Sequence, residues 1–528
     1  MVARLQQHQK AHIAKNYLGH ALRIAIIRRL MDPLFEIELE LPAKGSRDAA
    51  RSLFEQLKAA ILDRRLTAGA KLPPTRKSAD FFGVSRNTAS EIYDRLLHEG
   101  YVVTRHGAGT YVAETLSPHA PSPATARDAE PPDPRLNPFW LRAEVSDALG
   151  FWRDHGATAT LRTKTTAIDF RPALVDSRLF PFDVFRRVSA KQLRGLERKP
   201  ARFKSPQGNQ GNYHLRAAIG KHIALTRAVV CAPEDVLVTA GAQQAFDLIA
   251  RVLVTPGETV VAIEDPGYPP MRVPFAAAGA KLVPVGIDEE GLIVDALPAD
   301  VRVICVCPSH QFPLGVTMSA RRRRALVEFA RARGAVIVED DYDGEFRFGT
   351  SALAALRTAD AADVVFYVGT FSKCMLPSLR LGFIVAPPWA LRTLIAAKNG
   401  LDWHCAVPVQ LGVAAFIAEG HLTHHVRKMR AIYQRRRQLL LRALHEDFAR
   451  WLEAIPSDYG MHIAASVRGS PDLDAIAERL RERQVKLHTF GRYFCGPATR
   501  HGLVFGCGAV DLPEMRRGLA VLREALSA

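Results

Sequence analysis

Residues 369–383 read GTFSKCMLPSLRLGF, and this segment carries the most specific signal in the sequence. Its lysine, Lys373, follows a small polar segment. The amine of such a lysine can form an imine with a carbonyl cofactor when burial or a nearby cation lowers its pKa. Arg380 can hold a phosphate with its planar fork, and Thr370 and Ser372 add hydroxyl groups beside it. The stretch therefore predicts a site for a phosphorylated carbonyl cofactor.

Two upstream segments point to the same chemistry. VIVEDDYDGEFRF (336–348) is an apolar strand that ends in carboxylates, at the edge where doubly wound sheets bind ligands. A buried carboxylate there can pair with a pyridinium nitrogen. VTAGAQQAFDL (238–248) is a strand, a turn and a helix start, whose amides at Ala242 and Gln243 would point at an anion. Taken alone, each segment also fits a simpler interpretation: a surface lysine, an acidic loop or an ordinary strand–helix turn. Their order within one domain favours a cofactor site.

The pattern around these segments predicts the architecture of the large C-terminal part. Short apolar runs alternate with helical segments such as 243–253 and 320–333, which indicates a mostly parallel α/β sheet covered on both faces. From about His421 the chain is expected to be helix-rich and then α+β, with strands over 461–467 and 503–506. The strands expected in the sheet are 236–238, 260–263, 301–307, 336–338, 364–368 and 382–385.

A proline-rich stretch separates this part from a small basic domain. Seven prolines lie between residues 116 and 138, and the stretch is predicted to be a semi-rigid linker. Its second half, 139–165, is expected to hold a short helix that docks Trp140 and Trp152. The predicted domains are an N-terminal arm (1–46), a small domain (47–113), the linker (114–165) and the large domain (166–528). Residues 1–30 are interpreted as a basic arm or as sequence upstream of a mis-assigned start, and no function is placed there.

The small domain has the pattern of a winged helix-turn-helix. A first helix is expected over 47–65, a second over 76–82 after a Thr75 cap, and a third from Arg86 to about His98 after a Ser85 cap. A two-stranded wing follows over 101–105 and 110–112. The residues expected to face the core are Ala50, Leu53, Phe54, Leu57, Ile61, Leu62, Ile92, Tyr93, Leu96 and Leu97.

The segment LPPTRKSADFFGVSRNTASEIYDRLLHEGYVVTRHGAGTYV (72–112) resembles the winged-helix domain of GntR-type repressors. Arg86, Asn87 and Thr88 begin the third helix, where such motifs contact base edges and phosphates. One departure is Ser78, where the family usually has an apolar core residue, and it is expected to loosen the second helix. The DNA contacts that the resemblance implies are Arg76, Ser85, Arg86, Asn87, Thr88, His106 and Gly107.

The large domain resembles fold-type I aminotransferases, which use pyridoxal 5'-phosphate (PLP). Fused to a GntR-type domain, it is similar to the MocR/GabR family of bacterial regulators over nearly all of residues 47–528. Further family-like strings are EDPGYPP (264–270), CPSHQFPLGVTMS (307–319) and IDFRPALVDSRLFP (168–181). The resemblance implies that Lys373 is the Schiff-base lysine, Asp340 the pyridinium partner (Asp341 being a weaker candidate), Tyr342 the partner of the phenolic oxygen and Tyr268 the stacking ring. It assigns the phosphate to Ala242, Gln243, Thr370, Ser372 and Arg380.

Two departures from the aminotransferase pattern weigh against efficient transamination. The turn QFPLG has Phe312 where these enzymes usually have Asn, so that His310 or Gln311 must do any polar work. The late strand GLVFGCG (502–508) has no Arg for a substrate carboxylate, and a poorly oriented substrate reacts slowly. Arg272, Arg500 and His310 are the candidates for effector binding.

Composition limits the partners and the cellular location that we expect for the chain. The chain has 528 residues, a net charge of +17, no apolar run long enough for a membrane span, and seven cysteines without a CxxC pair. Residues 1–113 hold 18 Lys+Arg against 11 Asp+Glu, which favours nucleic acid as a partner. We expect a reduced, cytoplasmic homodimer without a membrane partner or a metal site. Its expected function is that of a regulator that binds operator DNA and senses PLP or an amine; the alternative is a working aminotransferase with an accessory DNA-binding domain.

Overall fold

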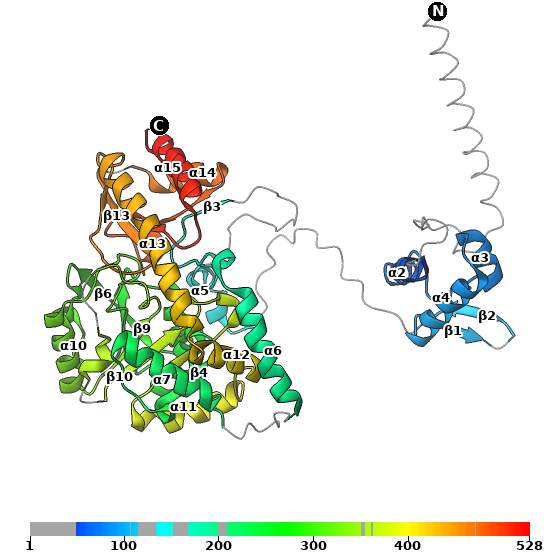
Figure 1. Cartoon of the computed structure of the whole chain (residues 1–528), viewed down its shortest axis with the longest axis horizontal. Coiled ribbons are helices and arrows are strands. Elements are labelled where there is room, and N and C mark those ends of the chain that lie inside the picture. Colours follow the sequence, from blue (N-terminus) through cyan, green and yellow to red (C-terminus); the bar gives the residue numbers. More distant parts are fainter. Residues whose placement is uncertain are drawn as a thin grey trace, which may run out of the picture. The chain divides into compact units, whose positions relative to one another are not determined.

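The computed structural model describes residues 49–105, 107–114, 134–151, 167–198, 208–349, 354–360, 363–469 and 471–527. The described residues fall into two compact units, divided between residues 132 and 133 (Figure 1). The N-terminal arm, His106, most of the proline-rich stretch and Trp152 lie outside the described residues. Within the described part, no helix is both long and apolar enough to cross a bilayer.

The small unit is a winged helix-turn-helix, as predicted. Its elements are α2 (Ala49–Leu62), α3 (Thr75–Phe82), α4 (Arg86–His98), β1 (Val102–Arg105) and β2 (Gly109–Val112). The two strands pair antiparallel to make the wing, and the helices bury a common core around Phe54 and Leu96. Two of the core predictions are wrong, since Leu62 is 43% exposed and Leu97 is 40% exposed. Each of these residues lies at the end of its helix, beyond the packed face.

The second helix is not loosened by Ser78. This side chain is fully buried, and its hydroxyl lies 2.8 Å from the hydroxyl of Tyr93, which in turn donates to the carbonyl of Pro73 at 2.9 Å. A buried hydroxyl costs little when its hydrogen bonds are made. The helix also starts one residue earlier than expected, since Pro74 takes the N-cap position and Thr75 is the first helical residue.

The large unit is built on an eight-stranded sheet with the order β4-β11-β10-β9-β8-β5-β6-β7. The pairs β10–β9, β9–β8, β8–β5 and β5–β6 are parallel, whereas β11 and β7 run antiparallel to their neighbours. The mostly parallel sheet is therefore confirmed. Its strands are β4 (Val236–Thr239), β5 (Val260–Asp265), β6 (Lys281–Asp288), β7 (Gly291–Leu292), β8 (Val301–Val306), β9 (Val336–Asp341), β10 (Val365–Thr370) and β11 (Gly382–Val385).

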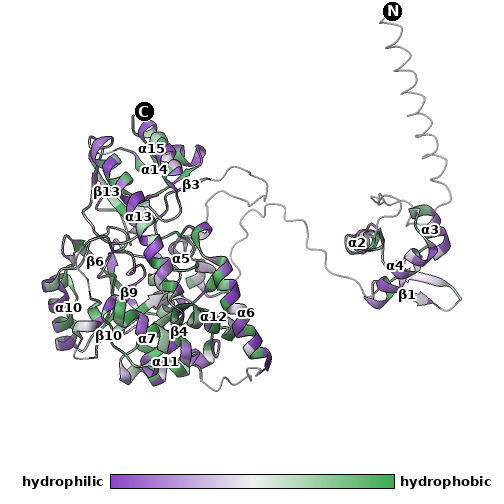
Figure 2. Cartoon of the chain, in the orientation of Figure 1, coloured by the Kyte–Doolittle hydropathy of each residue, from purple (hydrophilic) through white to green (hydrophobic). Residues whose placement is uncertain are grey.

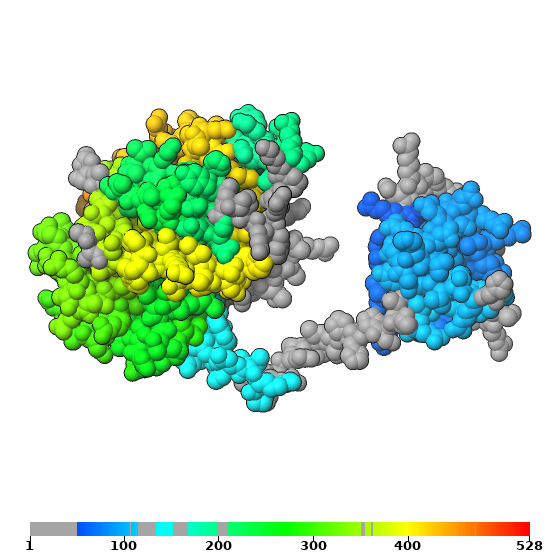
Figure 3. All heavy atoms as spheres, turned by 90° about the horizontal axis from the view of Figure 1, so that it is seen from below, coloured from blue at the N-terminus to red at the C-terminus, as the bar shows by residue number. Residues whose placement is uncertain are grey.

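Helices cover both faces of this sheet, because successive strand residues point to opposite sides. Leu237 of β4 packs into one core with residues of α8, α10 and α11. Val236 and Val238 pack into another core with residues of α7, α12 and α13 (His421–Glu446). α11 packs on α8 and α12 on α7, and Figure 3 shows the yellow residues of this region as a band across the green ones. The bounds are α6 (Phe182–Arg198), α7 (Tyr213–Arg227), α8 (Ala242–Leu253), α9 (Pro269–Ala277), α10 (Ala320–Arg333), α11 (Pro388–Leu401) and α12 (Val407–Ala418).

The C-terminal α+β part forms a smaller layer around the order β12-β13-β16-β15. It is joined to the sheet by the long helix α13, along which both hydrophilic and hydrophobic residues are seen in Figure 2. β3 (Ile168–Asp169) pairs in parallel with β14 (Val485–Lys486). The other elements are α13 (His421–Glu446), β12 (Leu452–Ala454), β13 (His462–Val467), α14 (Leu473–Glu482), β15 (His488–Thr489), β16 (Gly502–Gly506) and α15 (Leu512–Ser527).

Residues 134–151, expected in the linker, fold with the large unit instead. They form a 3₁₀ helix (Pro138–Leu141) and α5 (Ala143–Leu149). α5 packs on α9, with Val145 and Ala148 buried against Val273. Trp140 does not dock, because its side chain is 52% exposed.

Candidate functional site

A cavity of about 490 Å³ lies at the carboxyl ends of the parallel strands. This edge is where open α/β sheets bind their ligands, since the loops that follow the strands converge there. All nine side chains or backbone positions that the sequence assigned to the cofactor line this cavity. They are Lys373, Asp340, Tyr342, Tyr268, Ala242, Gln243, Thr370, Ser372 and Arg380.

Lys373 follows β10, and its amine is prepared for covalent chemistry. The Nζ atom donates to the carbonyl of Ala173 at 2.6 Å. Burial lowers the pKa of Lys373 to about 8; the negative charges of Asp343 and Asp340 oppose this shift, and the cation of Arg380 adds to it. A larger share of the amine is therefore neutral, and nucleophilic, than in an ordinary lysine.

Asp340, near the end of β9, has the surroundings expected for the partner of a cationic ring. Its Oδ1 atom is buried without a hydrogen-bond partner, and the Cys307 thiol lies 3.9 Å from Oδ2. Burial raises the pKa of Asp340 to about 8, helped by the charges of Asp341 and Asp343. A buried carboxyl oxygen without a partner in a cavity fits the protonated ring nitrogen of PLP.

Asp341 does not compete for this position. Its Oδ2 atom accepts from the Arg227 guanidinium at 2.6 Å and from the Tyr367 hydroxyl at 2.6 Å, and both ion-pair side chains are 3% exposed. Neighbouring residues of a strand point to opposite faces, so that Asp340 meets the cavity and Asp341 meets the core.

The other end of the cavity is suited to a phosphate. No side chain caps the N-terminus of α8, so that its first amides are available to an anion. Arg380 donates to the carbonyl of Ala240 at 2.9 Å and lies over Gly241, where a Cβ atom would come within 2.7 Å of the guanidinium. The hydroxyls of Thr370 and Ser372 are 3.0 Å apart. Because Gly241 has no side chain, the cation and the helix start can meet.

Aromatic groups form the remaining walls. The ring of Tyr268 packs edge-on against Phe312, with centroids 5.5 Å apart. The hydroxyl of Tyr342 lies 2.8 Å from Nδ1 of His310, and that nitrogen is 3.1 Å from Asp343. His310 therefore stands behind Tyr342 and does not line the cavity. His310, Asp343 and His462 each offer a possible metal-ligating atom, and these three atoms lie within 4.8 Å of one another. Asp343 also accepts a hydrogen bond from the amide of Met461.

The structure does not bring the two arginines proposed for an effector into the cavity. Arg272 donates to the carbonyls of Gly267 and Tyr493, and Arg500 is exposed. β16 carries no Arg, and a Cβ atom on Gly502 would come within 2.4 Å of the Ala465 carbonyl and the Phe490 ring. Of the described residues that line the cavity, Arg380 is the one arginine, and it lies at the phosphate end.

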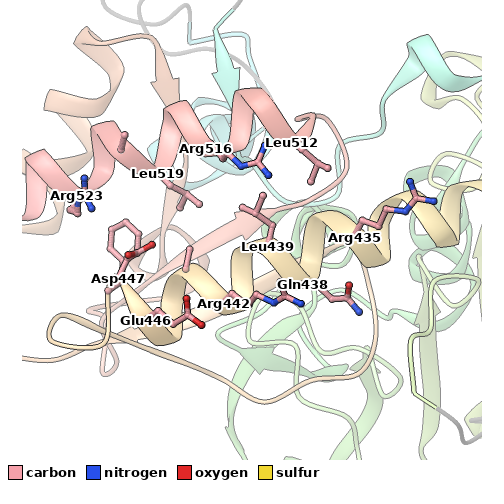
Figure 4. Close-up of a pocket in the computed structure, with 13 residues that line it drawn as sticks. Arg435, Gln438, Leu439, Arg442, Glu446, Asp447, Leu512, Arg516, Leu519 and Arg523 are labelled. Atoms are coloured by element: carbon pink, nitrogen blue, oxygen red, sulfur yellow. The ribbon is translucent and has the colours of Figure 1, made fainter.

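Sequence reasoning missed three contributors to the site: Ala173, which holds Lys373, Cys307 beside Asp340, and Phe151 beside Tyr268. Cys307 opened a family-like string that could have drawn attention to it. The hollow between α13 and α15, lined by four arginines (435, 442, 516 and 523), contains none of the predicted site residues (Figure 4).

In the small unit, four of the seven predicted DNA-contacting residues, Ser85, Arg86, Asn87 and Thr88, lie together at the start of α4. The Ser85 hydroxyl accepts from the amide of Thr88 at 3.1 Å, which confirms the cap. Arg86 and Asn87 are exposed in the first turn, and Arg76 is exposed at the start of α3. Neither arginine forms an ion pair within the part of the chain that the structure describes. Gly107 lies in the wing turn, with φ +72°.

Comparisons with known proteins agree with both halves of the chain. Residues 49–112 match the model of the bacterial regulatory proteins of the gntR family, and residues 177–500 match that of aminotransferase class I and II. The probable rhizopine catabolism regulatory protein MocR of Rhizobium meliloti is 34% identical over 90% of this chain and 94% of its own length. The pyridoxine biosynthesis regulator PdxR of Corynebacterium glutamicum is 31% identical over 90% of this chain and 95% of its own length.

Solved structures extend the similarity of the large unit. The α-aminoadipate aminotransferase LysN of Thermus thermophilus, complexed with a phosphopyridoxyl-leucine adduct, is 29% identical with a TM-score of 0.62, over 68% of this chain and 92% of LysN. The kynurenine aminotransferase of Pyrococcus horikoshii is 26% identical with a TM-score of 0.63, over 69% of this chain and 91% of the aminotransferase.

A winged helix joined to an aminotransferase-like domain with an intact cofactor cavity defines a class of DNA-binding regulators. The chain belongs to the MocR/GabR-type family of transcriptional regulators within that class.

Proposed function

We propose that this regulator binds operator DNA through α4 and the wing, and that PLP or a small amine bound in the large domain changes that binding. The observation that carries the proposal is the single cavity that joins the Lys373 amine, the unpartnered Asp340 oxygen and the anion-binding end. PLP, when bound, supplies a carbonyl group that reacts with amines and a ring that withdraws electrons from the product. The direct test is operator binding with and without the cofactor.

Each wall of the cavity has a proposed task. Lys373 holds the cofactor covalently, and Asp340 keeps the ring nitrogen protonated. The first amides of α8 (Ala242 and Gln243), the Thr370 and Ser372 hydroxyls and the Arg380 guanidinium bind the phosphate. Tyr268 stacks on the ring, and Tyr342, oriented by His310, bonds the phenolic oxygen. His310 thus takes an indirect part, while Arg272 and Arg500 keep no proposed role in effector binding.

We also propose a cytoplasmic homodimer. The support is the resemblance to fold-type I proteins and the advantage of two-fold symmetry on repeated DNA half-sites. α6 in addition exposes the apolar side chains of Phe182 and Leu193, by 54% and 50%, which a second subunit would cover.

The pKa of Lys373 predicts how cofactor attachment depends on pH. At pH 7 about a tenth of an amine with a pKa near 8 is neutral, against about one in three thousand for an ordinary lysine. The rate of attachment to the cofactor-free protein should therefore rise about tenfold from pH 7 to 9 and level off above pH 9. Stopped-flow absorbance after mixing with PLP measures this rate. A rate that keeps rising to pH 10 would show that the amine has an ordinary pKa.

Transamination is expected to be slow. The cavity has no arginine for a substrate carboxylate besides Arg380, and Phe312 replaces a polar group, so that amino-acid substrates would be poorly oriented. Steady-state turnover with common amino acids and keto acids should stay below about 1 per second, the low end for ordinary enzymes. Spectral changes on adding the same amino acids control for binding. Turnover at or above that rate would favour the alternative, a working aminotransferase.

A further inference from the structure

Phe151 ends the described segment 134–151, which precedes the sheet domain in the chain and lines part of the cofactor cavity. It is 2% exposed, and among the described residues four aromatic rings lie around it. Their centroids lie at 5.1 Å (His488), 5.5 Å (Tyr493), 5.9 Å (Tyr268) and 6.3 Å (Phe312), with interplanar angles of 66° to 87°. We call these four rings the aromatic nest. Edge-to-face packing of this kind selects flat aromatic groups.

The nest shares two of its rings with the wall of the cofactor cavity. Tyr268 and Phe312 belong both to the nest and to the wall of the cavity, and Ala148 and Leu149, just before Phe151, line the cavity as well. Phe151 is therefore placed where the side chain of an amine bound to the cofactor would extend. Since the described lining carries no arginine except at the phosphate end, the nest suits an apolar ring better than a carboxylate.

The segment that carries Phe151 is held by few groups. Between residues 134 and 151, the buried apolar side chains besides Phe151 are the small ones of Val145 and Ala148. Leu141 and Leu149 are 44% and 47% exposed. Phe151 lines a second hollow, of about 750 Å³, which shares Ala148 with the cavity. Phe151 thus borders empty space outside the nest, and its loss from the nest would remove the largest buried side chain of the segment.

We propose that the aromatic nest is the effector subsite, that it takes the ring of an arylalkyl amine, and that Phe151 is its built-in competitor. When such an amine binds, its ring replaces Phe151 and frees residues 134–151, which lengthens the connection between the two units. A ligand shifts this equilibrium because it binds only the displaced state. This inference rests on the proposed function, since the amine group must meet the cofactor.

Hydrogen exchange on the wild-type protein tests the displacement without any substitution. The PLP-loaded full chain is compared alone, with saturating 2-phenylethylamine, and with methylamine, which has the same amine group but no ring. The amides of residues 143–151 should exchange at least about tenfold faster with 2-phenylethylamine than with methylamine. Unchanged exchange with saturating 2-phenylethylamine would overturn the proposal.

Substitution of Phe151 tests the competition. Phe151→Ala and Phe151→Leu should bind 2-phenylethylamine more tightly, by about tenfold for alanine, in titrations of the visible cofactor spectrum, while methylamine affinity changes less than about twofold. Leu141→Ala, on an exposed residue of the same segment, is the matched control and should behave as wild type. Weaker or unchanged affinity of both Phe151 variants for 2-phenylethylamine would contradict the proposal. A visible cofactor band in every variant keeps this outcome separate from a failure of the cofactor assignment itself.

Discussion

Replacing Lys373 with alanine is expected to abolish the visible absorbance of the PLP-loaded protein. The band arises from the covalent bond between the cofactor and this amine, and no other lysine lines the cavity in the part of the chain that the structure describes. Absorbance spectra after removal of free PLP measure the loss, which should be complete. Lys191→Ala is the matched control, because the Lys191 side chain is 69% exposed on α6, and its spectrum should match the wild type.

Retention of the band in Lys373→Ala would contradict the assignment of the site. Asp340→Asn provides a second, independent check, since an amide cannot hold a ring nitrogen protonated as a carboxylate does. This variant should keep a covalently bound cofactor but shift the position or the pH dependence of its band. A spectrum identical to that of the wild type at every pH would show that Asp340 does not face the ring.

Replacing Arg86 with alanine should have the largest effect on DNA binding. Arg86 is exposed one residue beyond the Ser85 cap, where a recognition helix enters the major groove, and can hold guanine O6 and N7 with its fork. The loss should be about 1–3 kcal/mol on the operator, with relaxed base preference. Arg76→Ala, at the start of α3, should weaken all sequences alike and lower the salt dependence, as expected for a phosphate contact.

Gel-shift titrations and footprinting of the wild type and both variants measure these effects. Both variants should keep the Lys373-dependent band, which shows that the large unit is intact. Pairing of Arg86 with an acidic neighbour would have offered a purely structural role, but Arg86 makes no ion pair within the described residues. If neither substitution changes operator affinity, α4 is not the helix that recognises the operator.

The cofactor cavity could be predicted from sequence because its residues follow apolar strands in short, regular segments. The strand ends before Ala242, Tyr268, Tyr342 and Lys373 were all visible as apolar runs, and parallel strands bring such ends to one edge. β6 was not predicted, since Pro284 and Gly286 interrupt its pattern. β7 pairs only with the last two residues of β6, so that Pro284 lies where β6 has a single neighbour and a missing amide is tolerated.

The contacts that could not be predicted join residues far apart in the chain. Phe151 stands alone in a segment without periodicity, and its partners Tyr268, Phe312 and His488 are more than a hundred residues away. The hydrogen bond between Ser78 and Tyr93 likewise reverses the expected effect of a polar core residue. Helix periodicity assigns a face but not where packing ends, which is why Leu62 and Leu97 were misplaced.

Operator affinity measured with and without the cofactor shows whether the cofactor domain controls DNA binding. One preparation is divided into PLP-loaded and cofactor-free protein, and both are titrated at fixed salt against the same footprinted promoter fragment, with Lys373→Ala carried alongside. We expect the two forms to differ at least about fivefold in affinity, the lower end of usual coupling, and we expect Lys373→Ala not to respond to PLP. Equal affinities of the loaded and cofactor-free wild type would contradict this expectation.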